Sequence, residues 1–194
     1  MIERLIDRNL KFLKKHIVCD DDTVEVYRYS LRIIYSYIMD VLVLMSLAIV
    51  FNKVIETIIM LFTFAVLQVY GGGYHAKTQL GCMAIMVVGW FVGVFGLQKV
   101  VTLHWCVGLI IMIMFAFLIF SIAPIINEKH PVNSDIYVKS KKNVRIVVVL
   151  VGIIAVTSII VGCWSLYYII SITVTLYSMS LIAASLKQYQ ATRY

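Results

Sequence analysis

The residues best suited to chemistry lie in one short segment, residues 70–82, which reads YGGGYHAKTQLGC. It contains His75 and Cys82, with six residues between them. A cysteine becomes a strong nucleophile when a nearby imidazole takes its proton or stabilises the thiolate, and a helix N-terminus adds to that stabilisation. The pair predicts cysteine-peptidase chemistry. Spacing alone leaves open a structural cysteine beside an interfacial histidine.

Three consecutive glycines precede the histidine. Because glycine adopts positive φ readily and lets other groups approach closely, this stretch is suited to shaping an active-site loop. The backbone N–H groups of Gly72 and Gly73 could hold an oxyanion, so we predict that both glycines support the site.

Three residues are candidates for orienting His75, and the sequence does not rank them. Gln68 and Thr78 are close to it in the chain, whereas Asp40 lies within an apolar segment. An ionisable group at such a place is costly and often functional. Asp40 could complete a triad with His75, or it could pair with a hydroxyl such as that of Ser36.

The composition indicates an all-α integral membrane protein. Hydrophobic residues make up 62% of the 194, charged residues make up 14%, and the mean hydropathy is +0.95. Soluble domains have about 45–50% apolar and about 25% charged residues. The net charge of +7 does not indicate nucleic-acid binding, because the cations lie between apolar runs rather than on a continuous basic face.

Six hydrophobic segments approach the length of about 20 residues that a membrane-spanning helix needs. We predict them at residues 32–51, 54–70, 82–98, 104–126, 145–162 and 165–186. Residues 2–17 carry apolar side chains on one helical stripe and cations on the others, which is typical of an amphipathic helix lying on the membrane or packing on the protein's own core. We therefore predict a single membrane-embedded domain over 1–194, with amphipathic helices in 1–30 and the bundle in 32–186.

The distribution of cations predicts the orientation. With six spans and a cytoplasmic N-terminus, the outside loops hold Lys53 and Lys99, which leaves fifteen of the seventeen lysines and arginines inside. The positive-inside rule favours this arrangement clearly. Both termini, the segment 70–81 and a basic loop at 127–143 would then face the cytoplasm.

The cysteines give no sign of a metal site or of a disulfide framework. None of the four lies in a CxxC spacing, and we predict no metal and no cofactor.

The segment YGGGYHAKTQLGC resembles the signature of the AgrB family, accessory gene regulator protein B. Members are membrane cysteine endopeptidases of Gram-positive quorum sensing, and the resemblance extends over essentially the whole chain. Carried over residue by residue, the family's histidine falls on His75 and its nucleophile on Cys82. Many members have an arginine where this chain has Gln68, so substrate handling can differ here.

The resemblance also implies a substrate and a setting. The substrate would be an AgrD-like propeptide whose acidic C-terminal tail is removed through a thioester acyl-enzyme. The signal segment would then close into a cyclic thiolactone or lactone. A homodimer in the plasma membrane, in contact with lipid and with its active site at the cytoplasmic face, is implied as well.

An acidic tail would be attracted to the basic residues near the fifth hydrophobic segment, namely Lys129, Lys139, Lys141, Lys142 and Arg145. Alternatively, these charges serve to fix the topology. Two rival functions stay open on the sequence: a small peptide exporter, and a membrane sensor or scaffold without peptidase activity.

Overall fold

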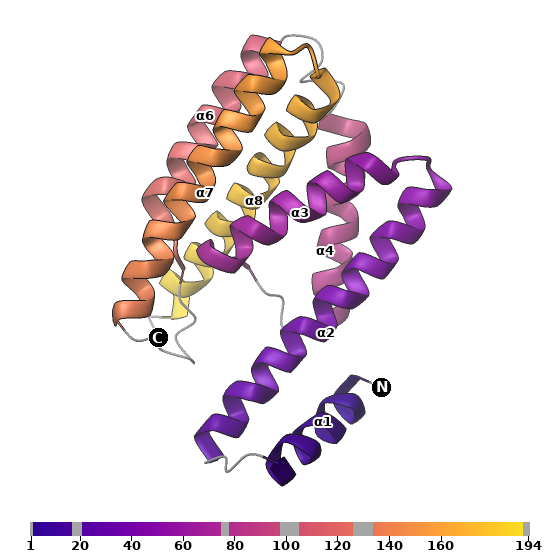
Figure 1. Cartoon of the computed structure of the whole chain (residues 1–194), viewed down its shortest axis with the longest axis vertical. Helices are drawn as coiled ribbons and strands as arrows, with labels where there is room; N and C mark the ends of the chain where they lie inside the picture. Colours follow the sequence, from indigo (N-terminus) through magenta and orange to yellow (C-terminus); the bar gives the residue numbers. More distant parts are fainter. Residues whose placement is uncertain (1, 17–20, 75–77, 98–104, 126–133, 192–194) are drawn as a thin grey trace. The chain divides into compact units, whose positions relative to one another are not determined.

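The computed structural model describes residues 2–16, 21–74, 78–97, 105–125 and 134–191. The regular secondary structure in these ranges is entirely helical (Figure 1): α1 Ile2–His16, α2 Asp21–Val50, α3 Val54–Gly71, α4 Gln79–Phe91, η1 Val92–Leu97, α6 Trp105–Ile122, α7 Ser134–Ile160 and α8 Trp164–Ala191. The predicted all-α class is confirmed.

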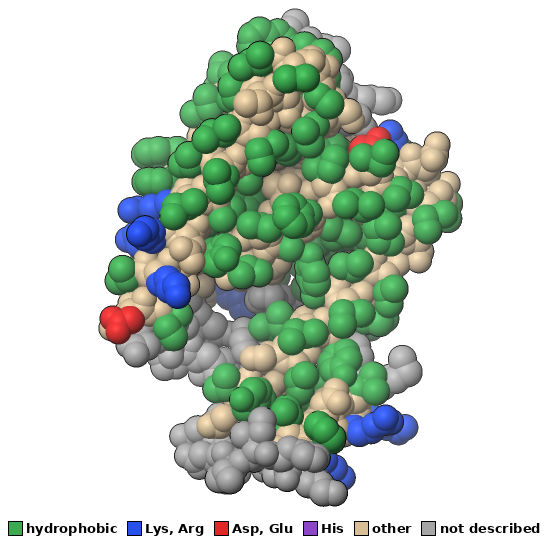
Figure 2. All heavy atoms as spheres, in the orientation of Figure 1, with side chains coloured by type: hydrophobic (Ala, Val, Ile, Leu, Met, Phe, Trp, Pro, Cys, Tyr) green, Lys and Arg blue, Asp and Glu red, His purple; other side chains and the backbone are tan. Residues whose placement is uncertain are grey.

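Hydrophobic side chains dominate the visible surface (Figure 2), and many large ones are exposed, such as Ile49, Phe62 and Phe117. A surface of this kind suits lipid rather than water. Within the described ranges, five helices are long and apolar enough to cross a membrane, namely α2, α3, α6, α7 and α8. The third predicted span, 82–98, corresponds to α4 followed by the π-helical turn η1, a shorter apolar helix.

The chain divides into two compact units, Met1–Leu44 and Met45–Tyr194. In the first, α1 packs along α2, because Asp7 pairs with Arg28 at 2.8 Å and Asn9 donates a hydrogen bond to the Tyr35 hydroxyl. The apolar stripe of α1 is buried at Ile6, while its cations Arg4, Arg8 and Lys11 are exposed. The amphipathic character predicted for residues 2–17 is therefore confirmed within α1, and the single domain over 1–194 stays a prediction.

In the second unit, α8 is the central helix and packs against α3, α6, α7 and η1. It is buried continuously from Tyr167 to Thr175, as expected for a helix surrounded by others. Its buried serine and threonine hydroxyls donate to carbonyls four residues earlier in the helix, so they need no partner on another helix.

Two segments begin earlier than the sequence predicted. The predicted loop at 127–143 is wrong from Ser134 onward, because α7 begins there. Lysine and arginine are good helix formers and Asp135 suits a helix N-terminus, so the polar stretch extends the helix rather than ending it. The helix that contains the first predicted span, 32–51, also extends further toward the N-terminus, since α2 begins at Asp21.

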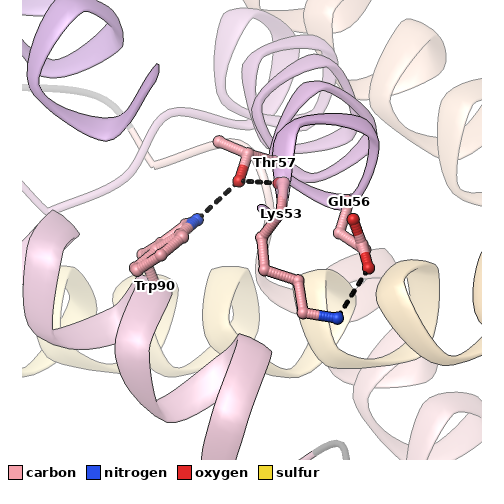
Figure 3. Close-up of polar contacts among 4 residues, drawn as sticks. All are labelled: Lys53, Glu56, Thr57 and Trp90. Carbon is pink, nitrogen blue, oxygen red and sulfur yellow. Dashed lines mark hydrogen bonds and ion pairs between the residues drawn. The ribbon is translucent and has the colours of Figure 1, made fainter. Parts of the chain in front are cut away.

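A buried hydrogen bond ties α4 to the start of α3 (Figure 3). The indole nitrogen of Trp90 donates to the Thr57 hydroxyl at 2.7 Å, and that hydroxyl donates to the carbonyl of Lys53 at 2.7 Å. Lys53 also pairs with Glu56 at 2.9 Å. Because Trp90 is fully buried, this contact fixes the end of α4 that lies away from Cys82.

Candidate active site

The candidate site begins where α3 ends, at the run of glycines. The N–H of Gly72 donates to the carbonyl of Gln68 at 2.9 Å and so caps the helix. Gly72 has φ 71° and ψ −161°, a conformation that is essentially confined to glycine. A Cβ at Gly72 would lie 2.6 Å from the carbonyl oxygen of Ile125, so both backbone shape and space require glycine.

Two other parts of the chain hold this segment. The Tyr177 hydroxyl on α8 donates to the carbonyls of Gly72 at 2.9 Å and Leu67 at 3.0 Å. The N–H of Ile125, which follows α6, donates to the carbonyl of Gly71 at 3.1 Å. The fit is close, since a Cβ on Gly71 would lie 2.2 Å from the Tyr177 hydroxyl oxygen.

The next residue, Tyr74, is held by α8 as well. Its N–H donates to the Ser180 hydroxyl at 3.1 Å, and the ammonium group of Lys187 lies 5.0 Å from the centre of its ring. The residue immediately before His75 is therefore fixed in place. His75 itself lies outside the described residues, so the predicted contact with Cys82 stays a prediction.

Cys82 lies in the first turn of α4, as the sequence predicted for a nucleophile at a helix N-terminus. Thr78 is the N-cap: its hydroxyl accepts from the N–H of Gly81 at 3.2 Å, and its carbonyl accepts from the N–H of Cys82 at 3.1 Å. The thiol is partly exposed. Thr78 was a candidate for orienting His75, and the structure gives it a capping role that positions Cys82.

The other two candidates for orienting His75 differ in their surroundings. The Gln68 side chain borders the glycine run, with two of its atoms 3.8 Å from the place where a Cβ of Gly73 would be. Asp40 is buried in α2, and its Oδ1 has no hydrogen-bond partner among the described residues. Whether either side chain meets His75 stays a prediction.

The basic residues of α7 lie at the same end of the second unit as the glycine run, because Val144 of α7 is next to Gly71. Figure 2 shows Lys and Arg side chains in blue along the lower part of α7. A hollow of about 420 Å³ is lined there by Tyr137, Val138, Lys141, Lys142, Arg145 and Ile146. Lys139 is exposed nearby on α7, and Lys129 lies outside the described residues.

Arg145 is the most constrained of these cations. Its guanidinium carbon lies 4.4 Å from the centre of the Phe120 ring, and its Nε is buried with no hydrogen-bond partner among the described residues. A cation held on an aromatic face, with its Nε–H unpaired in the part of the chain that the structure describes, suits an anionic ligand.

Sequence reasoning missed Tyr177, Ser180 and Lys187. Ser180 follows Tyr177 by three positions and Lys187 follows Ser180 by seven, so all three lie on one face of α8. In the sequence, the hydroxyl groups within an apolar helix were the feature that could have indicated Tyr177 and Ser180. That signal is weak, because tyrosines near span ends are also typical of the aromatic belt.

The comparisons with known proteins agree with the resemblance of the signature segment. The family described as AgrB, accessory gene regulator B, matches residues 6–185. The chain is 24% identical over 155 residues to AgrB-like protein 2 of Clostridium perfringens (strain 13 / Type A), covering 75% of this chain and 69% of that protein. It is 23% identical over 151 residues to an AgrB-like protein of Clostridium perfringens (strain SM101 / Type A), with the same coverage. Both relatives are named only by their likeness to AgrB. No solved structure matches. Since the family match extends over nearly the whole chain, the protein belongs to the accessory gene regulator B family.

Proposed function

We propose that this protein is a membrane cysteine endopeptidase that removes the C-terminal tail of an AgrD-like propeptide and cyclises the signal segment. Membership of the family supports a role in the agr quorum-sensing pathway. The observation that carries the finer proposal is the position of Cys82. It lies in the first turn of a capped helix, five residues beyond the segment 75–77 that contains His75 and that follows the anchored glycine run.

The proposed first step is acyl transfer to the enzyme. His75 accepts the proton of the Cys82 thiol, and the sulfur attacks the carbonyl carbon that joins the signal segment to the tail. The carbon–nitrogen bond then breaks, and His75 returns the proton to the leaving amine of the tail. The signal segment is left as a thioester on Cys82.

The second step closes the ring. A thiol or hydroxyl within the bound signal segment gives its proton to His75 and attacks the thioester carbonyl. The carbon–sulfur bond to Cys82 breaks, and His75 passes that proton to the departing sulfur. The product is a cyclic thiolactone or lactone, and the thiol of Cys82 is restored. Exclusion of water at this stage favours cyclisation over hydrolysis.

The two glycines take different roles in this proposal. The N–H of Gly72 is already donated to Gln68, so Gly72 supports the loop through its backbone conformation. We assign the oxyanion contact to the N–H of Gly73.

The acidic tail is proposed to bind the cations of α7. Lys139, Lys141, Lys142 and Arg145 lie at the same end as the glycine run, and Lys129 precedes them in the chain. A tail held there would be close to its cleavage point. The homodimer that the resemblance implies stays a prediction.

The test is tail release from a synthetic propeptide by the protein in liposomes, followed by mass spectrometry. We expect Cys82→Ala and His75→Ala to lower the rate of release by a factor of about 10³ or more. Cys106→Ala is the matched control, because Cys106 is an exposed thiol at the start of α6, and it should keep normal activity. Continued release by Cys82→Ala would overturn the assignment and favour the exporter or scaffold.

A further inference from the structure

We propose that Tyr177 and Ser180 of α8 are positioning residues that hold the segment bearing His75 in its reactive place. The inference rests on the proposed function and extends it to a helix that the sequence signature does not include. Neither residue touches the reacting atoms in this proposal. Both act through the backbone of residues 72–74.

Tyr177 is the first anchor. It is fully buried, and its hydroxyl donates to two carbonyls on either side of the end of α3, those of Leu67 and Gly72. The carbonyl of Gly72 lies just beyond the end of α3 and has no partner within the helix, and in a membrane no water replaces one. A single phenol therefore fixes the direction in which the chain leaves α3.

Ser180 is the second anchor, one turn further along the same face of α8. Its hydroxyl accepts from the N–H of Tyr74 at 3.1 Å. His75 is the next residue in the chain, and consecutive Cα atoms have a fixed separation of about 3.8 Å. Anchoring residues 72 and 74 therefore restricts where the imidazole can lie relative to Cys82.

The role of the hydroxyls can be separated from packing. The Tyr177 ring packs edge-on against Phe64, with ring centres 5.6 Å apart, and phenylalanine would keep that contact. Tyr177→Phe therefore removes the two hydrogen bonds and little else. Ser180→Ala removes the second anchor, and Ser180→Thr retains a hydroxyl.

The first experiment compares these variants in liposomes under single-turnover conditions with the synthetic propeptide. We expect Tyr177→Phe and Ser180→Ala to lower the rate of thioester formation by about 10- to 100-fold, since small displacements of a reacting group have effects of this size. KM should stay unchanged, and Ser180→Thr should recover much of the rate. Ser171→Ala is the control, because the Ser171 hydroxyl on the same helix contacts Tyr167 and Met112 and does not reach the glycine run. Normal rates in both Tyr177→Phe and Ser180→Ala would overturn the proposal.

The second experiment needs no peptidase activity, so it separates failure of this inference from failure of the proposed function. A Cβ on Gly71 would lie 2.2 Å from the Tyr177 hydroxyl oxygen, but 3.4 Å from the ring carbon that bears it. Gly71→Ala should therefore lower the unfolding midpoint in detergent much more in the Tyr177 protein than in Tyr177→Phe. An equal decrease of the unfolding midpoint in the two backgrounds would overturn the proposed role of Tyr177. If the wild-type protein releases no tail but the decreases of the unfolding midpoint are unequal, the proposed function is overturned and the role of Tyr177 is retained.

Discussion

At the residue scale, the hydroxyl of Thr57 has both a donor and an acceptor role. It donates to the carbonyl of Lys53 and accepts from the indole of Trp90, each at 2.7 Å (Figure 3). Thr57 and Trp90 are both fully buried. Because no water reaches such a place within a membrane, the indole N–H has no substitute for this acceptor.

We predict that Thr57→Val lowers the free energy of unfolding by about 1–3 kcal/mol, since it leaves a buried donor without a partner. Thr57→Ser, which keeps the hydroxyl, should lose much less. Chemical unfolding in detergent micelles, followed by tryptophan fluorescence, measures both.

Peptidase activity per folded molecule should not change in either variant, because Thr57 is about 21 Å from Gly71 along α3. A Val variant as stable as wild type would contradict the assigned role of the hydrogen bond.

Residue types identified the candidate pair His75 and Cys82 without any structure, because few side chains perform nucleophilic catalysis. The same reasoning could not reach Tyr177. Its hydroxyl is bound to carbonyls more than a hundred positions away in the chain, and local sequence contains no information on such a contact. Thr78 is an intermediate case. Its place in the chain between His75 and Cys82 indicated that it belongs to the site, whereas its role as the N-cap of α4 is apparent only from the structure.

At the element scale, α7 shows where reading polarity alone misleads. The stretch from Ser134 to Asn143 is polar and was predicted as loop, yet it forms the first turns of a long helix. The polarity of a segment indicates that it is exposed, but it does not determine the backbone conformation, because lysine, arginine and serine are all compatible with a helix. The span 54–70 and the start of the span 165–186 were predicted closely, because turn residues flank the apolar runs there, whereas α8 continues beyond residue 186 to Ala191.

The charge on these turns of α7 gives a second prediction. Lys141→Glu combined with Lys142→Glu should raise the KM for the propeptide about 10-fold or more, because an acidic tail would meet repulsion instead of attraction. The effect should weaken at high salt. Tail release at varied substrate concentration measures it.

The matched control replaces both residues with arginine, which keeps the charge and should keep KM. Membrane insertion of each variant is checked by carbonate extraction. An unchanged KM in the double glutamate variant would show that these charges serve topology alone.

At the scale of the whole molecule, α8 runs from one end of the second unit to the other. Cys163 immediately precedes the helix and Lys187 lies near its other end, about 36 Å away along the axis. That length exceeds the hydrocarbon core of about 30 Å. The glycine run and the cations of α7 share the end at Lys187, as the charge distribution predicted for the cytoplasmic face.

This arrangement predicts opposite accessibility for two native cysteines in proteins that retain only one of them. In intact cells, a membrane-impermeant maleimide should label Cys163, which lies in the exposed turn between α7 and α8. Cys82 should react only after the membrane is permeabilised.

Labelling of Cys82 from outside would contradict the cytoplasmic active site. Fractionation of the same cells tests the plasma membrane as the location. A protein with no cysteine serves as the background control.

The close approach of Gly71 to Tyr177 has an evolutionary consequence. A methyl group at position 71 and a phenolic oxygen at position 177 cannot occupy the same space, so the two positions share one volume. Homologous chains that replace the glycine at 71 should carry a shorter residue at 177, and chains that keep tyrosine should keep glycine. Substitutions at these two sites would then be inherited as a pair, even though one lies beside the catalytic signature and the other in the last helix.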